Sequence, residues 1–204
     1  MGAPSTPVLD TFSGTLSNWT NPAWSASDPM SISGGAAVGG VGIRAVMAWT
    51  APFAAGDLEC YATLPAGLFS GSEGYFYLKN ATSSAHGYQL TLASATSYVV
   101  RKVTDDFSST IILSGSFTTA AGDKFALQRI GTAINLWQYT AGAWAQFDTV
   151  TDASYSDLTT IGIGVDNDSI TFDDFGGGTP VAAAANTSPS RRTMPIGAHK
   201  PIVF

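Results

Sequence analysis

Apolar and polar residues alternate over most of this 204-residue chain, in short segments separated by turn-forming residues. An alternation of period two is typical of β-strands, and no segment keeps the spacing of an amphipathic helix. Strands that recur every roughly 8–12 residues indicate an all-β, antiparallel β-sandwich. The pattern predicts strands at residues 75–79, 87–93, 97–103, 109–117, 124–130, 133–139, 143–150, 160–165 and 169–175, and weaker ones at 8–12, 36–41, 43–49 and 57–64.

Two similar phrases bracket this pattern, VLDTFSGTL from Val8 and SITFDDFGGG up to Gly178. First and last strands that stayed unpaired would leave exposed sheet edges, and the two ends of a domain commonly lie close together. We therefore expect the strand near 8–12 to pair with the strand near 169–175. The predicted organisation is a lead-in at 1–7, a sandwich at 8–178, and a linker with an extended C-terminal arm at 179–204.

The order of these segments resembles the concanavalin A-like, or laminin G-like, jelly-roll domains. The matching pieces are LDTFSGTLSNWT, WSASDPMSISGGAAVGG, GYQLTL, FTTAAGDKFALQRIGTAINLWQYTAGAW and ITFDDFGGG. The resemblance covers about residues 8–178, and the segment 121–144 is its most specific part. It implies a lectin-like sandwich, but one fold hosts many functions, so it supports the fold better than an activity.

Glycosidases with this architecture use a close pair of carboxylates, which in the related glucanases come from a Glu-x-Asp-x-Glu strand. This chain has only Glu59 and Glu73, on different segments. Asp173 and Asp174 are adjacent, so on a strand they would face opposite ways. We therefore expect a protein that is not an enzyme.

The strand AINLWQY offers candidate sugar-binding residues, because Asn135, Trp137 and Tyr139 share one of its faces. Lectin-like sandwiches use exposed aromatic rings beside polar groups to bind sugars. The alternative is that both faces of this strand are covered and that Trp137 packs beside Trp144 across a hairpin.

The loop VDNDS offers oxygen ligands for a structural calcium ion, from Asp166, Asn167 and Asp168. The same residues are favoured in a tight β-hairpin turn for the sake of the backbone, and we expect the turn and no cofactor. The single cysteine, Cys60, lies in an alternating segment, where it is expected to be a small buried apolar residue.

Charge divides the chain into two parts. Residues up to 178 contain six Lys and Arg against all fifteen Asp and Glu, a net charge of −9 that would repel nucleic acid.

No apolar run approaches the roughly 20 residues that span a bilayer, which predicts no membrane insertion. No basic and apolar leader follows Met1, and we expect no secretory signal peptide.

The C-terminal arm, by contrast, is basic, proline-punctuated and apolar at its end. Its prolines favour an extended chain, which could bind in a groove of another subunit. The predicted anchoring residues are Arg191, Arg192, Pro195, Ile196, Lys200, Ile202, Val203 and Phe204.

A lectin-like sandwich with such an arm resembles accessory bacteriophage virion proteins, since laminin G-like domains occur among phage tail, fibre and head-decoration proteins. The resemblance implies a capsid decoration or tail appendage, made in the host cytoplasm and located in the virion. Its partners would be other virion proteins or copies of itself, and host surface glycans. The alternative is a bacterial carbohydrate-binding module that adheres to cell-surface glycans.

Overall fold

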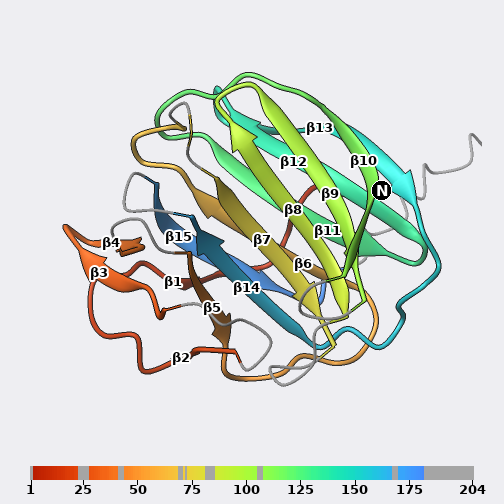
Figure 1. Cartoon of the computed structure of the whole chain (residues 1–204), viewed down its shortest axis with the longest axis horizontal. Helices are drawn as coiled ribbons and strands as arrows, with labels where there is room; N and C mark the ends of the chain where they lie inside the picture. Colours follow the sequence, from red (N-terminus) through yellow and green to blue (C-terminus); the bar gives the residue numbers. More distant parts are fainter. Residues whose placement is uncertain are drawn as a thin grey trace, which may run out of the picture.

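The computed structural model describes residues 2–22, 28–40, 44–68, 71, 73–80, 86–104, 108–166 and 170–181, and every regular element in these ranges is a β-strand. The strands form two antiparallel sheets packed face to face (Figure 1). The predicted all-β sandwich is therefore confirmed. Within the described ranges, no helix is long and apolar enough to cross a membrane.

The sheet nearer the viewer in Figure 1, here called the front sheet, has seven strands. In spatial order they are β10 (Ser109–Ser116), β9 (Ser97–Val103), β8 (Gly87–Ser94), β7 (Gly74–Lys79), β14 (Thr160–Val165), β5 (Ala45–Trp49) and β2 (Trp19–Thr20). The back sheet has eight strands. They are β13 (Ala143–Thr151), β12 (Ala133–Thr140), β11 (Lys124–Ile130), β6 (Leu58–Thr63), β15 (Thr171–Gly178), β4 (Ala36–Val38) and β3 (Ser31–Ser33), with β1 (Val8–Asp10) also paired to β15.

The core lies between the sheets and is built from alternate residues of each strand. Phe76 of β7 meets Phe172 of β15 edge to face, with ring centroids 5.3 Å apart. Cys60 is fully buried, and burial raises the pKa of its thiol. The expectation that Cys60 is a buried apolar residue is therefore confirmed.

The first and last strands pair as predicted. β1 runs antiparallel to β15, with Val8 opposite Gly176 and Asp10 opposite Phe175. The alternating pattern missed β2 and β3, which have two and three residues.

The last strand is longer than the predicted segment 169–175, because β15 continues through three glycines to Gly178. A Cβ atom on Gly176 would lie 2.2 Å from Cζ of Tyr61, and one on Gly177 would lie 2.5 Å from the backbone oxygen of Glu59. The glycines therefore allow β15 to pack close to β6. Strand propensity does not reveal this, because glycine is disfavoured in strands.

Candidate functional site

The predicted residues Asn135 and Trp137 lie on the outer face of the back sheet, but they are buried there. Strand register places Glu59, Gln128 and Asn135 side by side on β6, β11 and β12. The side chains of Asn135 and Trp137 both donate hydrogen bonds to Oε1 of Gln128, at 3.3 and 3.1 Å. Asn135 is fully buried and Trp137 is 7% exposed, so neither offers a surface for stacking a sugar.

Residues 2–6, here called the N-terminal strap, lie over this row. The backbone N–H groups of Ser5 and Thr6 donate to Oε1 of Glu59, at 2.7 and 2.8 Å. Nε2 of Gln128 donates to Oε2 of Glu59 at 2.7 Å and to the backbone oxygen of Gly2 at 3.3 Å. The fully buried side chain of Glu59 thus accepts hydrogen bonds from three neutral donors, which offset part of the cost of burying its polar oxygens.

Tyr139, the third predicted residue, lines an open cleft at the side of the strap. A two-residue turn, in which Ala141 and Gly142 both have positive φ angles of 52° and 88°, sets Tyr139 opposite Trp144. The aromatic partners of Trp144 are Tyr139 and Tyr61, at centroid distances of 5.3 and 5.8 Å. Trp144 also packs against the buried cluster of Tyr61, Ala126 and Trp137, in agreement with the alternative that this face is covered and that Trp137 lies beside Trp144. The cleft has a volume of about 270 Å³ and is lined by Pro4, Ser5, Thr6, Tyr61, Lys124, Tyr139 and Trp144.

Two other groups of predicted residues fall largely outside the described part of the chain. Of the candidate calcium ligands only Asp166 is described, and Asn167 and Asp168 are not. Among the residues that the structure describes, no group of three His, Cys, Asp or Glu side chains could hold a metal ion. All the predicted anchoring residues of the arm lie outside the described ranges. The last described residue, Val181, donates its N–H to Oγ of Ser5 at 3.2 Å.

The outer face of the front sheet holds a second set of polar and aromatic residues, and of these only Asp166 was predicted from the sequence as a candidate ligand-binding residue. On β7, Phe76 and Leu78 face the core, so Tyr75 and Tyr77 face outward. Register sets both tyrosines beside glycines of β14, with Gly164 opposite Tyr75 and Gly162 opposite Tyr77. Because these glycines carry no side chains, the tyrosine rings can pack beside Val46 and Ala48 of β5, in a small cluster that is shielded from solvent.

Arg44, just before β5, lies over these tyrosines. Its guanidinium carbon is 4.5 Å from the centre of the Tyr75 ring, and its Nη2 donates to the Tyr77 hydroxyl at 2.8 Å. The hydroxyl of Tyr75 donates in turn to Oε2 of Glu73 at 2.5 Å. Stacking and hydrogen bonding together fix the direction of the exposed Arg44 side chain.

The surroundings of Arg44 and Tyr77 keep both side chains protonated at neutral pH. Burial disfavours the charged form of Arg44, but Tyr77, Tyr75 and Asp166 outweigh burial and raise the pKa of Arg44. Burial is the largest cause that raises the pKa of Tyr77 to about 12, against the opposing effect of Arg44. Arg44 therefore stays a cation, and Tyr77 stays a neutral hydroxyl that can accept its hydrogen bond.

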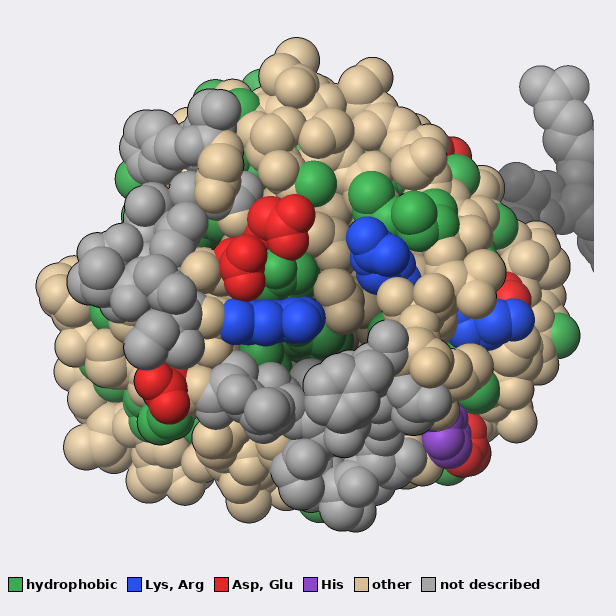
Figure 2. Space-filling view, in the orientation of Figure 1, with side chains coloured by type: hydrophobic (Ala, Val, Ile, Leu, Met, Phe, Trp, Pro, Cys, Tyr) green, Lys and Arg blue, Asp and Glu red, His purple; other side chains and the backbone are tan. Residues whose placement is uncertain are grey.

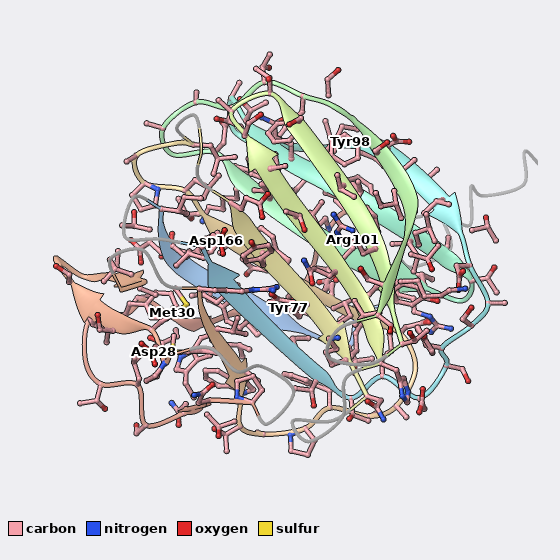
Figure 3. All side chains as sticks on the ribbon, viewed as in Figure 1. Asp28, Met30, Tyr77, Tyr98, Arg101 and Asp166 are labelled. Carbon is pink, nitrogen blue, oxygen red and sulfur yellow. The ribbon has the colours of Figure 1, made fainter. Side chains whose placement is uncertain are left out.

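Figure 2 shows that this face is hollowed, with acidic and basic side chains next to each other at one side of the hollow and a further basic side chain at its opposite side. In Figure 3, Asp166 and Arg101 lie on opposite sides of Tyr77. The strand order agrees, since Asp166 follows β14 and Arg101 belongs to β9, two strands beyond β7. We call this group, Arg44, Glu73, Tyr75, Tyr77, Arg101 and Asp166, the front hollow.

Comparisons with known proteins bear on the fold. No protein-family model matches the sequence, and no curated protein is similar to it in sequence. The exoplasmic/lumenal domain of VIP36, metal-free, has a TM-score of 0.62 at 10% identity, over 86% of this chain and 92% of that chain. The potassium-bound carbohydrate recognition domain of Emp46p has a TM-score of 0.59 at 13% identity, over 86% and 97%.

A third similar structure comes from a bacteriophage. It is the CBM2 module of the evolved Dit of Lactobacillus casei BL23 phage J-1, with a TM-score of 0.60 at 12% identity, over 90% of this chain and 100% of that chain. The chain therefore has the concanavalin A-like jelly-roll fold of lectin and carbohydrate-binding domains. At these identities the likeness defines the fold alone.

Proposed function

We propose that this chain is a carbohydrate-binding domain whose ligand contacts the front hollow. The observation that carries the proposal is the fixed Arg44, stacked on Tyr75 and bonded to Tyr77 in a hollowed face that also presents carboxylates. Sugar hydroxyls both donate and accept hydrogen bonds. A guanidinium supplies donors and carboxylates supply acceptors, so the front hollow can bind neighbouring hydroxyls of one sugar ring.

The fold supports the same proposal. Similar sandwiches include a carbohydrate recognition domain and a phage CBM2 module. A ligand would meet donors that are already positioned, so little side-chain ordering would oppose binding. The back-sheet cleft beside Tyr139 and Trp144 is a second aromatic surface, and it provides an internal control for the position of the ligand.

A glycan array screened with the full chain tests the proposal, followed by titration calorimetry of each glycan that binds. Arg44→Ala is expected to weaken binding by about tenfold to a hundredfold, because a hydrogen bond to a charged group contributes about 1.5–3 kcal/mol. Lys124→Ala is the matched control, since Lys124 is a cation paired with Asp174 on the back sheet. Binding by no glycan, or equal loss in both variants, would contradict the proposal.

We further propose that the domain belongs to a bacteriophage virion, as a capsid decoration or tail appendage anchored by its C-terminal arm. Two observations favour this: the likeness to the phage module over that module's whole length, and the reversal of charge between the acidic sandwich and the basic arm. Other virion proteins or copies of this chain would be its partners. The protein would be made in the host cytoplasm and located in the virion.

Removal of residues 188–204 is expected to abolish incorporation into the particle while leaving the melting temperature of the sandwich nearly unchanged. The physical reason is that an extended apolar and basic segment adds contacts only with a partner surface. Quantitative mass spectrometry of purified particles measures incorporation, and calorimetry measures the melting temperature. Normal occupancy of the truncated protein would overturn the anchoring role.

A further inference from the structure

Positive charge is unevenly placed on this acidic domain. Residues up to 178 carry six Lys and Arg against fifteen Asp and Glu. Three of these six cations, Arg44, Lys79 and Arg101, belong to the front sheet or its margin and share the outer face with Tyr77. A net charge of −9 would by itself repel an anionic ligand, so the position of these cations decides which ligands this face accepts.

The cations elsewhere in the domain are each paired with a carboxylate. Lys102 lies 3.5 Å from Asp152, Lys124 lies 3.0 Å from Asp174, and Arg129 lies 3.6 Å from Asp57. On the front face, Arg44 bonds to Tyr77, and Lys79 is buried with its Nζ 5.9 Å from the centre of the Tyr77 ring. Within the described part of the chain, Arg101 alone among the Lys and Arg residues has no hydrogen-bond, ion-pair or aromatic-ring partner.

The described residues that lie beside Arg101 on the outer face of the front sheet are uncharged. Across the strands it lies opposite Gln89 of β8 and Ile111 of β10, and the residues on the same face of β9 are Val99 and Val103. The amide of Gln89 donates to Oγ1 of Thr91 at 2.8 Å. Arg101 is half-buried. A partly desolvated guanidinium without an anion is unfavourable, and a ligand that brings an anion removes that cost.

We infer that the ligand of the front hollow is an anionic glycan, whose carboxylate or phosphate group is bound by Arg101. The inference rests on the proposed carbohydrate-binding function. Tyr77, Gln89 and Arg101 form one row across three adjacent strands, so the Cα atoms of Tyr77 and Arg101 are about 10 Å apart. One oligosaccharide can therefore reach both Arg44, above Tyr77, and Arg101. The guanidinium fork of Arg101 matches both carboxylate and phosphate oxygens.

Matched pairs of probes test the inference on the full chain. The probes are uronic acid oligosaccharides, the same oligosaccharides with their carboxyl groups reduced to alcohols, and a polyglycerol phosphate. We expect the wild-type protein to bind an acidic probe at least tenfold more tightly than its neutral counterpart, with an affinity that falls as salt rises. Whether the uronate or the phosphate polymer binds distinguishes the two sources of the anion.

Variants at Arg101 show whether this residue causes the preference for the acidic probe. Arg101→Gln is expected to abolish the preference for the acidic probe, and Arg101→Lys to retain part of it, because lysine keeps the charge without the fork. Lys102→Gln is the matched control on the same strand, since Lys102 is paired with Asp152, and it should leave the preference unchanged. Circular dichroism verifies that each variant is folded.

Failure of the inference and failure of the proposed function give different results. Glycan binding that depends on Arg44 but does not distinguish acidic from neutral probes overturns the anionic ligand and leaves carbohydrate binding standing. The same holds if Arg101→Gln keeps the acidic preference. If neither these probes nor the glycans of an array bind, both the inference and the proposed function are overturned.

Discussion

Replacing Glu59 with alanine is expected to lower the free energy of unfolding by about 3–5 kcal/mol. The carboxylate is fully buried and accepts hydrogen bonds from the backbone of Ser5 and Thr6 and from the side chain of Gln128. Its removal leaves three donors without their acceptor, and each unsatisfied buried donor costs about 1–3 kcal/mol. The expected loss lies in the lower part of the range that three such costs would give, because the strap can move away from the sheet and let water hydrogen-bond to the freed donors.

Urea unfolding of a double-mutant cycle measures this effect. The second change is deletion of residues 2–6, which removes the strap and opens the carboxylate to water. In the shortened protein, Glu59→Ala should cost less than half of its effect in the full chain, because two of the three donors are gone. Glu59→Gln, which keeps the shape of the side chain, should lie between wild type and alanine. An effect of Glu59→Ala that is independent of the strap would contradict this account.

Replacing Trp19 with alanine is expected to cost about 3–5 kcal/mol, as large-to-small changes of buried aromatic residues do. Trp19 is 8% exposed and packs on Phe12, Trp49 and Phe175, with ring centroids 5.6, 5.4 and 4.7 Å away. Its Nε1 also donates to Oδ2 of Asp10 at 2.7 Å. This cluster joins the beginning of the chain to its last strand.

Trp19→Phe separates the packing of the ring from the hydrogen bond. Phenylalanine keeps most of the aromatic contacts but cannot donate to Asp10, so a loss of about 1.5–3 kcal/mol is expected. Thermal or urea unfolding measures both variants, and far-UV circular dichroism verifies the sheet structure. If the alanine variant were as stable as the phenylalanine variant, the aromatic cluster would not hold the two ends of the domain together.

The same cluster explains the two phrases that bracket the sandwich. In VLDTFSGTLSNWT, Oδ1 of Asp10 accepts the N–H of Phe12 while Oδ2 accepts the Trp19 side chain. In SITFDDFGGG, Phe175 packs on Trp19, and the glycines let β15 pass close to β6. The aspartate and aromatic residues that carried the resemblance to jelly-roll domains thus act in packing and local hydrogen bonding, which is why they indicated the fold and not a ligand.

The candidate site could be predicted only in small part. The strand of Asn135, Trp137 and Tyr139 was predicted, and so was the shared face of these residues, because alternation is a local property of the backbone. Their burial was one of two alternatives, and the sequence did not show what covers this face, because the strap consists of residues 2–6, far from β12 in the chain. Only Tyr139, at the side of the strap, lines an open cleft.

The front hollow was not predicted because its residues come from separate segments. Arg44 precedes β5, Tyr77 belongs to β7, and Asp166 follows β14. They meet because β14 lies between β7 and β5 in the sheet, an order that the chain sequence does not display. A weaker signal was present in TIGIGV, where two glycines on one face of a strand leave space for neighbouring rings.

The sequence by itself determined the strands, most of their bounds and the pairing of the first with the last, since these depend on local periodicity and on closure of an edge. Only the tertiary structure decided which outward faces stay accessible and which cations keep a carboxylate partner. Burial and charge pairing depend on contacts between residues far apart in the chain. Arg101 illustrates this, because its sequence neighbour Lys102 pairs with Asp152, just after β13 of the other sheet, while Arg101 faces the hollow without a partner in the described part of the chain.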